Sequence, residues 1–304
     1  MNDVRVGVTP PWDLGSVAAE DQRRRLAAVA DAGIDHIFTA DHVSFIGGAG
    51  IDGPVRLAAI GGMEPRLGLY LGVFLLSLRH PLVAARQIAS LAEMAPGRVT
   101  IGVGVGGEDR HEFEVCEIDP ATRGRRTDSA LDIVRRLLDG ETVHGDGTFY
   151  EFTDALIRPT PEPRIAFTVG GRSDAAIERA ARLGDGWLAS WCSVGRFASG
   201  VAIAEELGAD RSVDWQHGLQ IWAGIGDDRA EARGYVADGM QTFYGIPFEA
   251  FEKYTPMGTA DDIADFLLPY VEAGAKVINV SPCGPTREAE AEVMGAVAQR
   301  LRRG

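Results

Sequence analysis

The sequence predicts an α/β fold, specifically a (β/α)8 TIM barrel, and three observations support this. Eight short runs are apolar or rich in β-branched residues, and most are continuously apolar, as parallel strands buried on both faces are. Helical patterns separate these runs at regular intervals, which is typical of alternating strands and helices. No low-complexity linker divides the chain, so we expect one domain over residues 1–304. A doubly wound sheet is the alternative.

The expected elements follow from these patterns. We expect strands over residues 4–8, 35–39, 66–74, 98–105, 164–170, 186–190, 218–225 and 276–281. We expect helices over residues 20–33, 81–97, 127–140, 173–186 and 259–274. Thr127 and Ser173 are residue types that cap helix N-termini, and Thr259 with Asp262 three residues later predicts a capping box.

Two connections between expected elements are long, residues 106–126 and residues 227–258. The second predicts an insertion near the late strands, and its aromatic residues are Phe243, Tyr244, Phe248, Phe251 and Tyr254. Long loops in compact domains are often lids or binding loops. A helical insertion that packs on the barrel through its aromatic side chains is the alternative.

Charge and cysteine content limit the partners and the compartment. The net charge of −14 disfavours nucleic acid and anionic lipid as partners, which leaves a small molecule. No run approaches the ~20 apolar residues of a membrane span, and the N-terminal residues do not resemble a secretion signal. The 3 cysteines are far apart and odd in number, which favours reduced thiols in a cytoplasm.

The segment IGVGVGGEDRHEFE, residues 101–114, contains the spacing G-x-G-x-x-G at Gly102, Gly104 and Gly107. That spacing indicates dinucleotide binding when it joins a strand to a helix of a mononucleotide-binding unit. Here it follows the fourth expected strand, and Glu108 and Asp109 place two carboxylates where a pyrophosphate would bind, so we reject NAD. A glycine-rich strand end instead lets a flat ring approach the backbone, with Glu108 at the ring edge.

A second glycine-rich turn joins the expected strand 164–170 to the expected helix 173–186. Its sequence is Gly170-Gly171-Arg172-Ser173. Free backbone N–H groups and the positive end of the helix favour a phosphate there, and Arg172 adds a charge. An ordinary turn with a solvated arginine is the alternative.

Five segments, in order and with matching spacing, resemble the bacterial-luciferase-like family of flavin- and deazaflavin-dependent oxidoreductases. They are ADHV (40–43), LRHPLVAARQIASL (78–91), GRVTIGVGVGGEDRHEFE (97–114), RGRRTDSALDIVRRLL (123–138) and VGGRSDAAIERAARLGDGW (169–187). The resemblance implies a TIM barrel with a cofactor over its mouth, and often a homodimer. The turn with Glu108 resembles the branch that uses coenzyme F420, a 5-deazaflavin, although members that use FMN share much of the framework.

The resemblance also implies the residues of the site. Asp41 and His42 match an acidic residue and a histidine that touch the deazaflavin and face the substrate. Leu71 and Gly72 fall where relatives often carry a non-prolyl cis peptide behind the ring, and Phe74 lies further along that strand. The other matching residues are Gly106, Gly107, Glu108 and His111 along the ring edge, and Val169, Gly170, Gly171 and Arg172 around the phosphate.

A deazaflavin exchanges hydride at its C5, so the protein must bind it, orient it and handle one proton. His42 is the first candidate for that proton because an unperturbed histidine has a pKa of ~6.5. A structural histidine bonded to the adjacent loop is the alternative. Glu108 is the second candidate, and a carboxylate that stabilises the start of a helix is its alternative.

Other chemistries have weaker support. The histidines, acidic residues and Cys116 show no standard ligand spacing, so we expect no metal. No G-x-S-x-G sequence supports a nucleophile triad. The alternatives to an F420-dependent oxidoreductase are an FMN-dependent monooxygenase on the same barrel and a non-catalytic cofactor-binding protein. Asp13 and Arg79 are interpreted as surface residues near the mouth.

Overall fold

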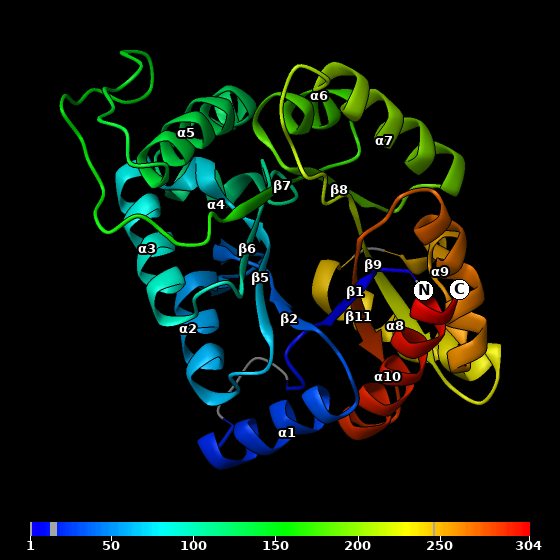
Figure 1. Ribbon diagram of the computed structural model, residues 1–304. Helices are drawn as coiled ribbons and strands as arrows, with labels where there is room; N and C mark the ends of the chain where they lie inside the picture. Colours follow the sequence, from blue (N-terminus) through cyan, green and yellow to red (C-terminus); the bar gives the residue numbers. More distant parts are fainter. Residues whose placement is uncertain (1, 13–16, 246) are drawn as a thin grey trace.

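A computed structural model describes residues 2–12, 17–245 and 247–304 and shows a closed barrel of parallel strands (Figure 1). The barrel strands are β1 (Arg5–Val8), β2 (His36–Thr39), β5 (Gly68–Phe74), β6 (Val99–Val103), β7 (Ala166–Gly170), β8 (Gly186–Ser190), β9 (Gly218–Ile225) and β11 (Val277–Cys283). Each pairs in parallel with the next, and β11 pairs with β1, so the sheet closes on itself. The predicted TIM barrel and its eight strands are therefore confirmed.

Helices form a ring outside the strands (Figure 1). They are α1 (Ala19–Asp31), α2 (Gly53–Met63), α3 (Pro81–Met94), α5 (Arg123–Leu138), α6 (Asp174–Leu183), α7 (Val194–Leu207), α9 (Ala260–Glu272) and α10 (Arg287–Arg303). The two ends of the chain meet, because the backbone N–H of Asn2 donates to the carbonyl of Arg302 at 2.9 Å. None of the helices in the described ranges has both the length and the apolar character needed to cross a membrane.

The predicted helix starts have different outcomes. The capping box is confirmed, since the side chains of Thr259 and Asp262 each bond the backbone of the other at the start of α9. The predicted cap at Thr127 is wrong, because α5 begins four residues earlier, at Arg123. The helix continues directly from the 3-10 turn η2 (Pro120–Thr122), so Thr127 is buried inside it and its hydroxyl donates to the carbonyl of Arg123.

Several short elements were not predicted. After β2 the chain forms an antiparallel hairpin of β3 (His42–Phe45) and β4 (Ala49–Ile51). The connection 106–126 holds α4 (Arg110–Val115) and η2, and η1 (Leu76–Leu78) precedes α3. A further long connection, residues 139–165, has a single bridge between Val143 and Ala155 and reaches away from the helix ring (Figure 1).

The predicted insertion near the late strands is confirmed between β9 and α9. It consists of α8 (Arg229–Tyr244), η3 (Phe248–Ala250), η4 (Glu252–Tyr254) and a short extra strand β10 (Met257–Gly258), which pairs with β9. Helix α8 packs against β9, β10 and β11, whereas α9 packs beside α10 in the outer ring. The insertion is helical and packs on the barrel, as the alternative states, and the last turn of α8 reaches the cavity described next. A role as a lid or binding loop stays a prediction.

Candidate active site

A cavity of about 190 Å³ opens at the C-terminal ends of the barrel strands. Glu108 follows β6 and Gly170 ends β7, and both line this cavity, so they lie at the same end of the barrel as predicted. The predicted site residues that line it are Asp41, His42, Gly72, Gly106, Glu108, Gly170 and Gly171. Active sites of TIM barrels lie at this end.

Six predicted cofactor-binding residues do not line the cavity, and they are Leu71, Phe74, Gly107, His111, Val169 and Arg172. Leu71, Phe74 and Val169 are buried in the hydrophobic core that the strands share with the surrounding helices. His111 lies on the outside of α4 with 71% of its side chain exposed, since the Asp109 side chain caps the helix just before it. Gly107 and Arg172 lie next to residues that do line the cavity, Gly106 and Gly171. The assignment of these six residues to a cofactor stays a prediction.

His42 and Glu112 form a hydrogen-bonded pair at the cavity. Nδ1 of His42 lies 3.1 Å from Oε2 of Glu112, which comes from α4 and is 2% exposed. Oε1 of Glu112 accepts hydrogen bonds from the backbone N–H groups of Val43 at 2.7 Å and Ser44 at 3.2 Å. Burial acts to raise the pKa of Glu112, but the hydrogen bonds from His42 and the two backbone groups hold it below its usual value.

This pair fixes the tautomer of the histidine. An ionised carboxylate only accepts hydrogen bonds, so Nδ1 of His42 carries a proton and Nε2 is the acceptor of the neutral ring. Nε2 has no hydrogen-bond partner in the part of the chain that the structure describes. The ring also stacks on Phe45, with centroids 4.1 Å apart. His42 therefore has one available acceptor atom at the wall of the cavity.

Asp41 is held in a buried ion pair. Its carboxylate accepts two hydrogen bonds from Arg79, at 2.6 and 2.8 Å, and one each from the backbone N–H groups of Gly53 and Leu75. Burial raises the pKa of Asp41, against the lowering effect of Arg79. The interpretation of Arg79 as a surface residue is wrong, because the ion pair leaves only 12% of its side chain exposed. Asp13 lies outside the described residues.

Gly72 and Val73 both line the cavity, and the peptide between them is called its floor here. The non-prolyl cis peptide joins Gly72 to Val73, one residue after the predicted pair Leu71 and Gly72. The regular pairing of β5 with β6 extends through Leu71 and shifts only beyond it, which places the irregular peptide after Leu71. A Cβ atom at Gly104 or at Gly170 would lie within 2.8 Å of the Val73 side chain, so both glycines make room for Val73.

Hydrogen-bonded side chains connect this floor to the inside of the barrel, through half-buried Gln220 and buried Asn279. Nε2 of Gln220 donates to the carbonyl of Gly72 at 3.0 Å, and Oε1 of Gln220 accepts from Asn279 at 3.3 Å. Oδ1 of Asn279 in turn lies 2.6 Å from Nε2 of His36. Burial lowers the pKa of His36 to about 4, so this ring is neutral. Its N–H donates to Asn279, Asn279 donates to Gln220, and Gln220 donates to the carbonyl of Gly72 at the cavity floor.

The turn before α6 has the features predicted for a phosphate site. Gly170 and Gly171 line the cavity, and the backbone N–H groups of residues 172–175 have no partner among the described residues. Ser173 stands at the N-cap, but its side chain makes no capping hydrogen bond, contrary to the predicted cap. Arg172 is exposed and its guanidinium lies 6.0 Å from the centre of the Trp191 ring.

The remaining wall is aromatic, and sequence reasoning assigned none of its residues to the site. Its members are Phe45, Trp191, Trp222, Phe243 and Tyr244. They come from β3, the end of β8, β9 and the last turn of α8. Burial raises the pKa of Tyr244 to about 12, so its phenol keeps its proton at neutral pH. A cluster of aromatic residues in 227–258 was the only sequence signal for this wall.

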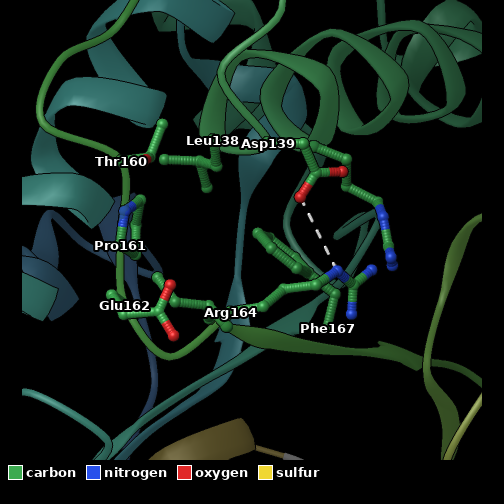
Figure 2. A pocket seen from close by; sticks show the side chains of 9 residues that line it. Leu138, Asp139, Thr160, Pro161, Glu162, Arg164 and Phe167 are labelled. Atoms are coloured by element: carbon green, nitrogen blue, oxygen red, sulfur yellow. Dashed lines mark ion pairs between the residues drawn. The ribbon is translucent and has the colours of Figure 1, made fainter.

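A second cavity, of about 250 Å³, lies at the opposite end of the barrel (Figure 2). Its residues come from the end of α5 and its C-cap, from the connection before β7 and from the start of β7, and Figure 2 shows Arg164 pointing toward Asp139 across it. Arg164 also lies 3.2 Å from Asp185, a buried aspartate that Arg135 contacts through both terminal nitrogens at 3.1 Å. Arg135 and Arg164 are therefore both held in ion pairs with aspartates at this end.

Comparison with protein families identifies a family model described as luciferase-like monooxygenase, which matches residues 5–275. An uncharacterized protein of Mycobacterium tuberculosis is 37% identical over 134 residues, which cover 44% of this chain and 46% of that protein. An F420-dependent glucose-6-phosphate dehydrogenase of Beutenbergia cavernae is 34% identical over 171 residues, which cover 54% of this chain and 50% of the relative. The chain thus spans about half the length of the curated relatives it matches.

Solved structures of similar shape share the barrel over nearly the full chain. An F420-dependent secondary alcohol dehydrogenase in complex with an F420–acetone adduct has a TM-score of 0.84 at 16% identity and covers 98% of this chain and 99% of that one. A monooxygenase from Streptomyces bottropensis has a TM-score of 0.80 at 21% identity, with 99% of both chains covered. At these identities the likeness shows the fold alone.

Proposed function

The chain belongs to the luciferase-like monooxygenase family, and from that premise we propose that it is a coenzyme F420-dependent oxidoreductase that transfers hydride between the deazaflavin and a small organic molecule. The observation that carries the proposal is the His42–Glu112 pair, which presents one hydrogen-bond acceptor at the cavity. Curated relatives named as F420-dependent dehydrogenases support the choice of cofactor.

The cavity has the features that a flat, phosphorylated cofactor requires. We propose that the Gly72–Val73 peptide, Gly106 and Glu108 would hold the cofactor ring. The free N–H groups at the start of α6 and the charge of Arg172 would bind the phosphate. The indole N–H of Trp191 is buried and has no hydrogen-bond partner among the described residues. A bound ligand with an acceptor atom beside this N–H would satisfy it. A bound deazaflavin would supply hydride exchange at its C5.

In this proposal His42 handles the proton that accompanies the hydride. Glu112 holds the ring in the tautomer with its proton on Nδ1, so Nε2 accepts a proton from a substrate hydroxyl when the substrate is oxidised. In the reverse direction the protonated ring donates from the same atom. Glu112 acts as a positioning residue, because its carboxylate contacts the histidine and two backbone N–H groups.

A cofactor titration tests the proposal. The purified protein is titrated with coenzyme F420 and separately with FMN, and the dissociation constants are compared. We expect F420 to bind more tightly and to undergo reduction, seen as loss of its visible absorbance, when a substrate alcohol is added. Tighter binding of FMN, or no binding of F420, would refute the assignment of the cofactor.

An FMN-dependent monooxygenase is the second candidate, because the matching family model and a similar solved structure are both described as monooxygenases. It predicts that the protein with reduced flavin consumes oxygen in proportion to the product formed. The deazaflavin proposal predicts substrate-dependent hydride transfer without oxygen uptake. An oxygen electrode under turnover conditions separates the two.

A further inference from the structure

We infer that the substrate of this site is a neutral alcohol or carbonyl compound with an aromatic or other flat apolar group, and that phosphorylated or carboxylated compounds are excluded. The inference rests on the proposed function and adds the substrate class. It depends on three properties of the cavity: an aromatic wall, the absence of Lys and Arg from the described lining residues, and the His42 ring beside that wall.

The aromatic wall is built from rings that hold one another in place. The Phe243 ring lies 4.7 Å from that of Tyr244, 5.7 Å from Phe45 and 5.9 Å from Trp222. Tyr244 also contacts Trp191 at 5.5 Å. These are the separations of packed aromatic pairs, so the wall is preformed. Such a surface gains most from contact with apolar or aromatic groups of a ligand.

The charges at the cavity disfavour an anionic substrate. None of its lining residues in the described ranges is Lys or Arg, and the residues outside those ranges, 1, 13–16 and 246, include neither type. Arg79 is bound to Asp41, and Arg172 lies outside the lining at the proposed cofactor phosphate. Glu108 adds a carboxylate to the lining. A phosphate or carboxylate on the substrate would therefore lose water and meet a like charge without a counter-ion.

The acceptor lies beside the apolar wall, because the His42 ring stacks on Phe45 and lies 6.4 Å from Phe243. A neutral alcohol can place its hydroxyl on Nε2 of His42 while its apolar group lies along these two phenyl rings. Oxidation of that alcohol removes a hydride from its carbinol carbon, which reduces the cofactor. The hydroxyl proton passes to Nε2 of His42, and a carbonyl compound is the product.

Matched probes test the inference by binding as well as by turnover. Calorimetry compares 1-phenylethanol with 4-(1-hydroxyethyl)benzoate, which has the same shape plus a carboxylate, on protein saturated with reduced F420, which cannot oxidise an alcohol. Glucose 6-phosphate is the third probe. We expect 1-phenylethanol to bind at least about tenfold more tightly than either anion. Equal or tighter binding of an anion, or no binding of 1-phenylethanol, overturns the inference.

Turnover with oxidised F420 then separates this inference from the proposed function. If 1-phenylethanol binds selectively but the cofactor is not reduced, the substrate class stands and the hydride-transfer proposal fails. If an anionic probe reduces the cofactor more efficiently, the proposed function stands and the substrate class fails.

Two variants locate the source of the selectivity. Phe243→Arg places a cation in the wall, so the benzoate should then bind more tightly than 1-phenylethanol. Glu108→Gln removes the lining carboxylate, so the preference for 1-phenylethanol over the benzoate should fall by about threefold or more. Leu207→Arg makes the same charge change as Phe243→Arg on an exposed face of α7 and should leave the preference unchanged. If neither lining variant moves the ratio of the two dissociation constants, charge at the cavity does not set the selectivity and the inference is wrong.

Discussion

Each end of the barrel holds a cavity and, beside it, a buried aspartate that an arginine contacts with two nitrogens. At the C-terminal end Arg79 lies 2.6 and 2.8 Å from the oxygens of Asp41, and at the N-terminal end Arg135 lies 3.1 Å from both oxygens of Asp185. Both aspartates also accept backbone N–H groups, and burial raises the pKa of both. By these measures the two ends are alike.

The ends differ in the groups that remain available for a ligand. At the N-terminal end Arg135 and Arg164 both face Asp185, and Arg164 also faces Asp139 at 3.6 Å (Figure 2). At the C-terminal end Nε2 of His42 has no partner within the described ranges, and the wall beside it is aromatic. A buried carboxylate with a shifted pKa therefore does not by itself identify an active site. A better indicator is a hydrogen-bonding group without a partner at the C-terminal end of the barrel, where active sites of this fold lie.

The largest expected effect would come from removing the available acceptor. A positioned acid or base contributes ~10²–10⁴ in rate, so His42→Ala should lower turnover by about that factor and leave cofactor affinity nearly intact. Single-turnover rates and cofactor titrations measure both quantities. Asp139→Asn, at the other end, should change neither. If His42→Ala turns over like the parent, the histidine is structural and the proton role moves to Glu108 or another group.

The second expected effect concerns the two buried ion pairs. Arg79→Ala leaves Asp41 buried without its arginine and should lower the free energy of unfolding by about 3–5 kcal/mol. Arg135→Ala should cost less, because Arg164 still lies 3.2 Å from Asp185. Urea denaturation of both variants measures the difference. An equal loss would show that Arg164 does not compensate at the N-terminal end.

A third prediction concerns the cofactor phosphate at the C-terminal end. Arg172→Ala should weaken cofactor binding by ~1–3 kcal/mol, the range for a charge-assisted hydrogen bond. Arg182→Ala is the matched control, because Arg182 is an exposed arginine in the last turn of α6, at the end away from Arg172. Unchanged affinity of the Arg172 variant would assign that side chain to solvent.

The sequence predicted the barrel well because its buried strands are continuous apolar runs with local boundaries. The hairpin β3–β4 was missed because its strands are short, although Gly47 and Gly48 between them are a turn signal. Both glycines have positive φ, at 75° and 86°.

Site residues were predicted only where a local motif held them. His42 and Glu112 are 70 residues apart, and Arg79 and Asp41 are 38 apart, so both partnerships depend on how the strands close the barrel. No spacing along the chain reports such contacts. The outward position of His111 is a local feature of α4, which begins directly after the Asp109 cap. The homodimer and the cytoplasmic location stay predictions.

The smallest expected effect is a pH dependence that separates Glu112 from the buried carboxylates at the other end. Its folded-state pKa is held below the usual 4.5, so the ionised form stabilises the fold above that value, and this contribution is lost as the pH falls through the lower folded-state pKa. Glu112→Gln should therefore destabilise the protein more at about pH 5.5 than at about pH 3.5, by on the order of 1 kcal/mol. The buried His36 ring, with a pKa of about 4, titrates in the same window in both proteins and cancels from the difference. Urea denaturation of parent and variant at the two pH values measures this difference in destabilisation. Equal destabilisation at both values would mean that folding does not favour the ionised form of Glu112, on which the His42 tautomer depends.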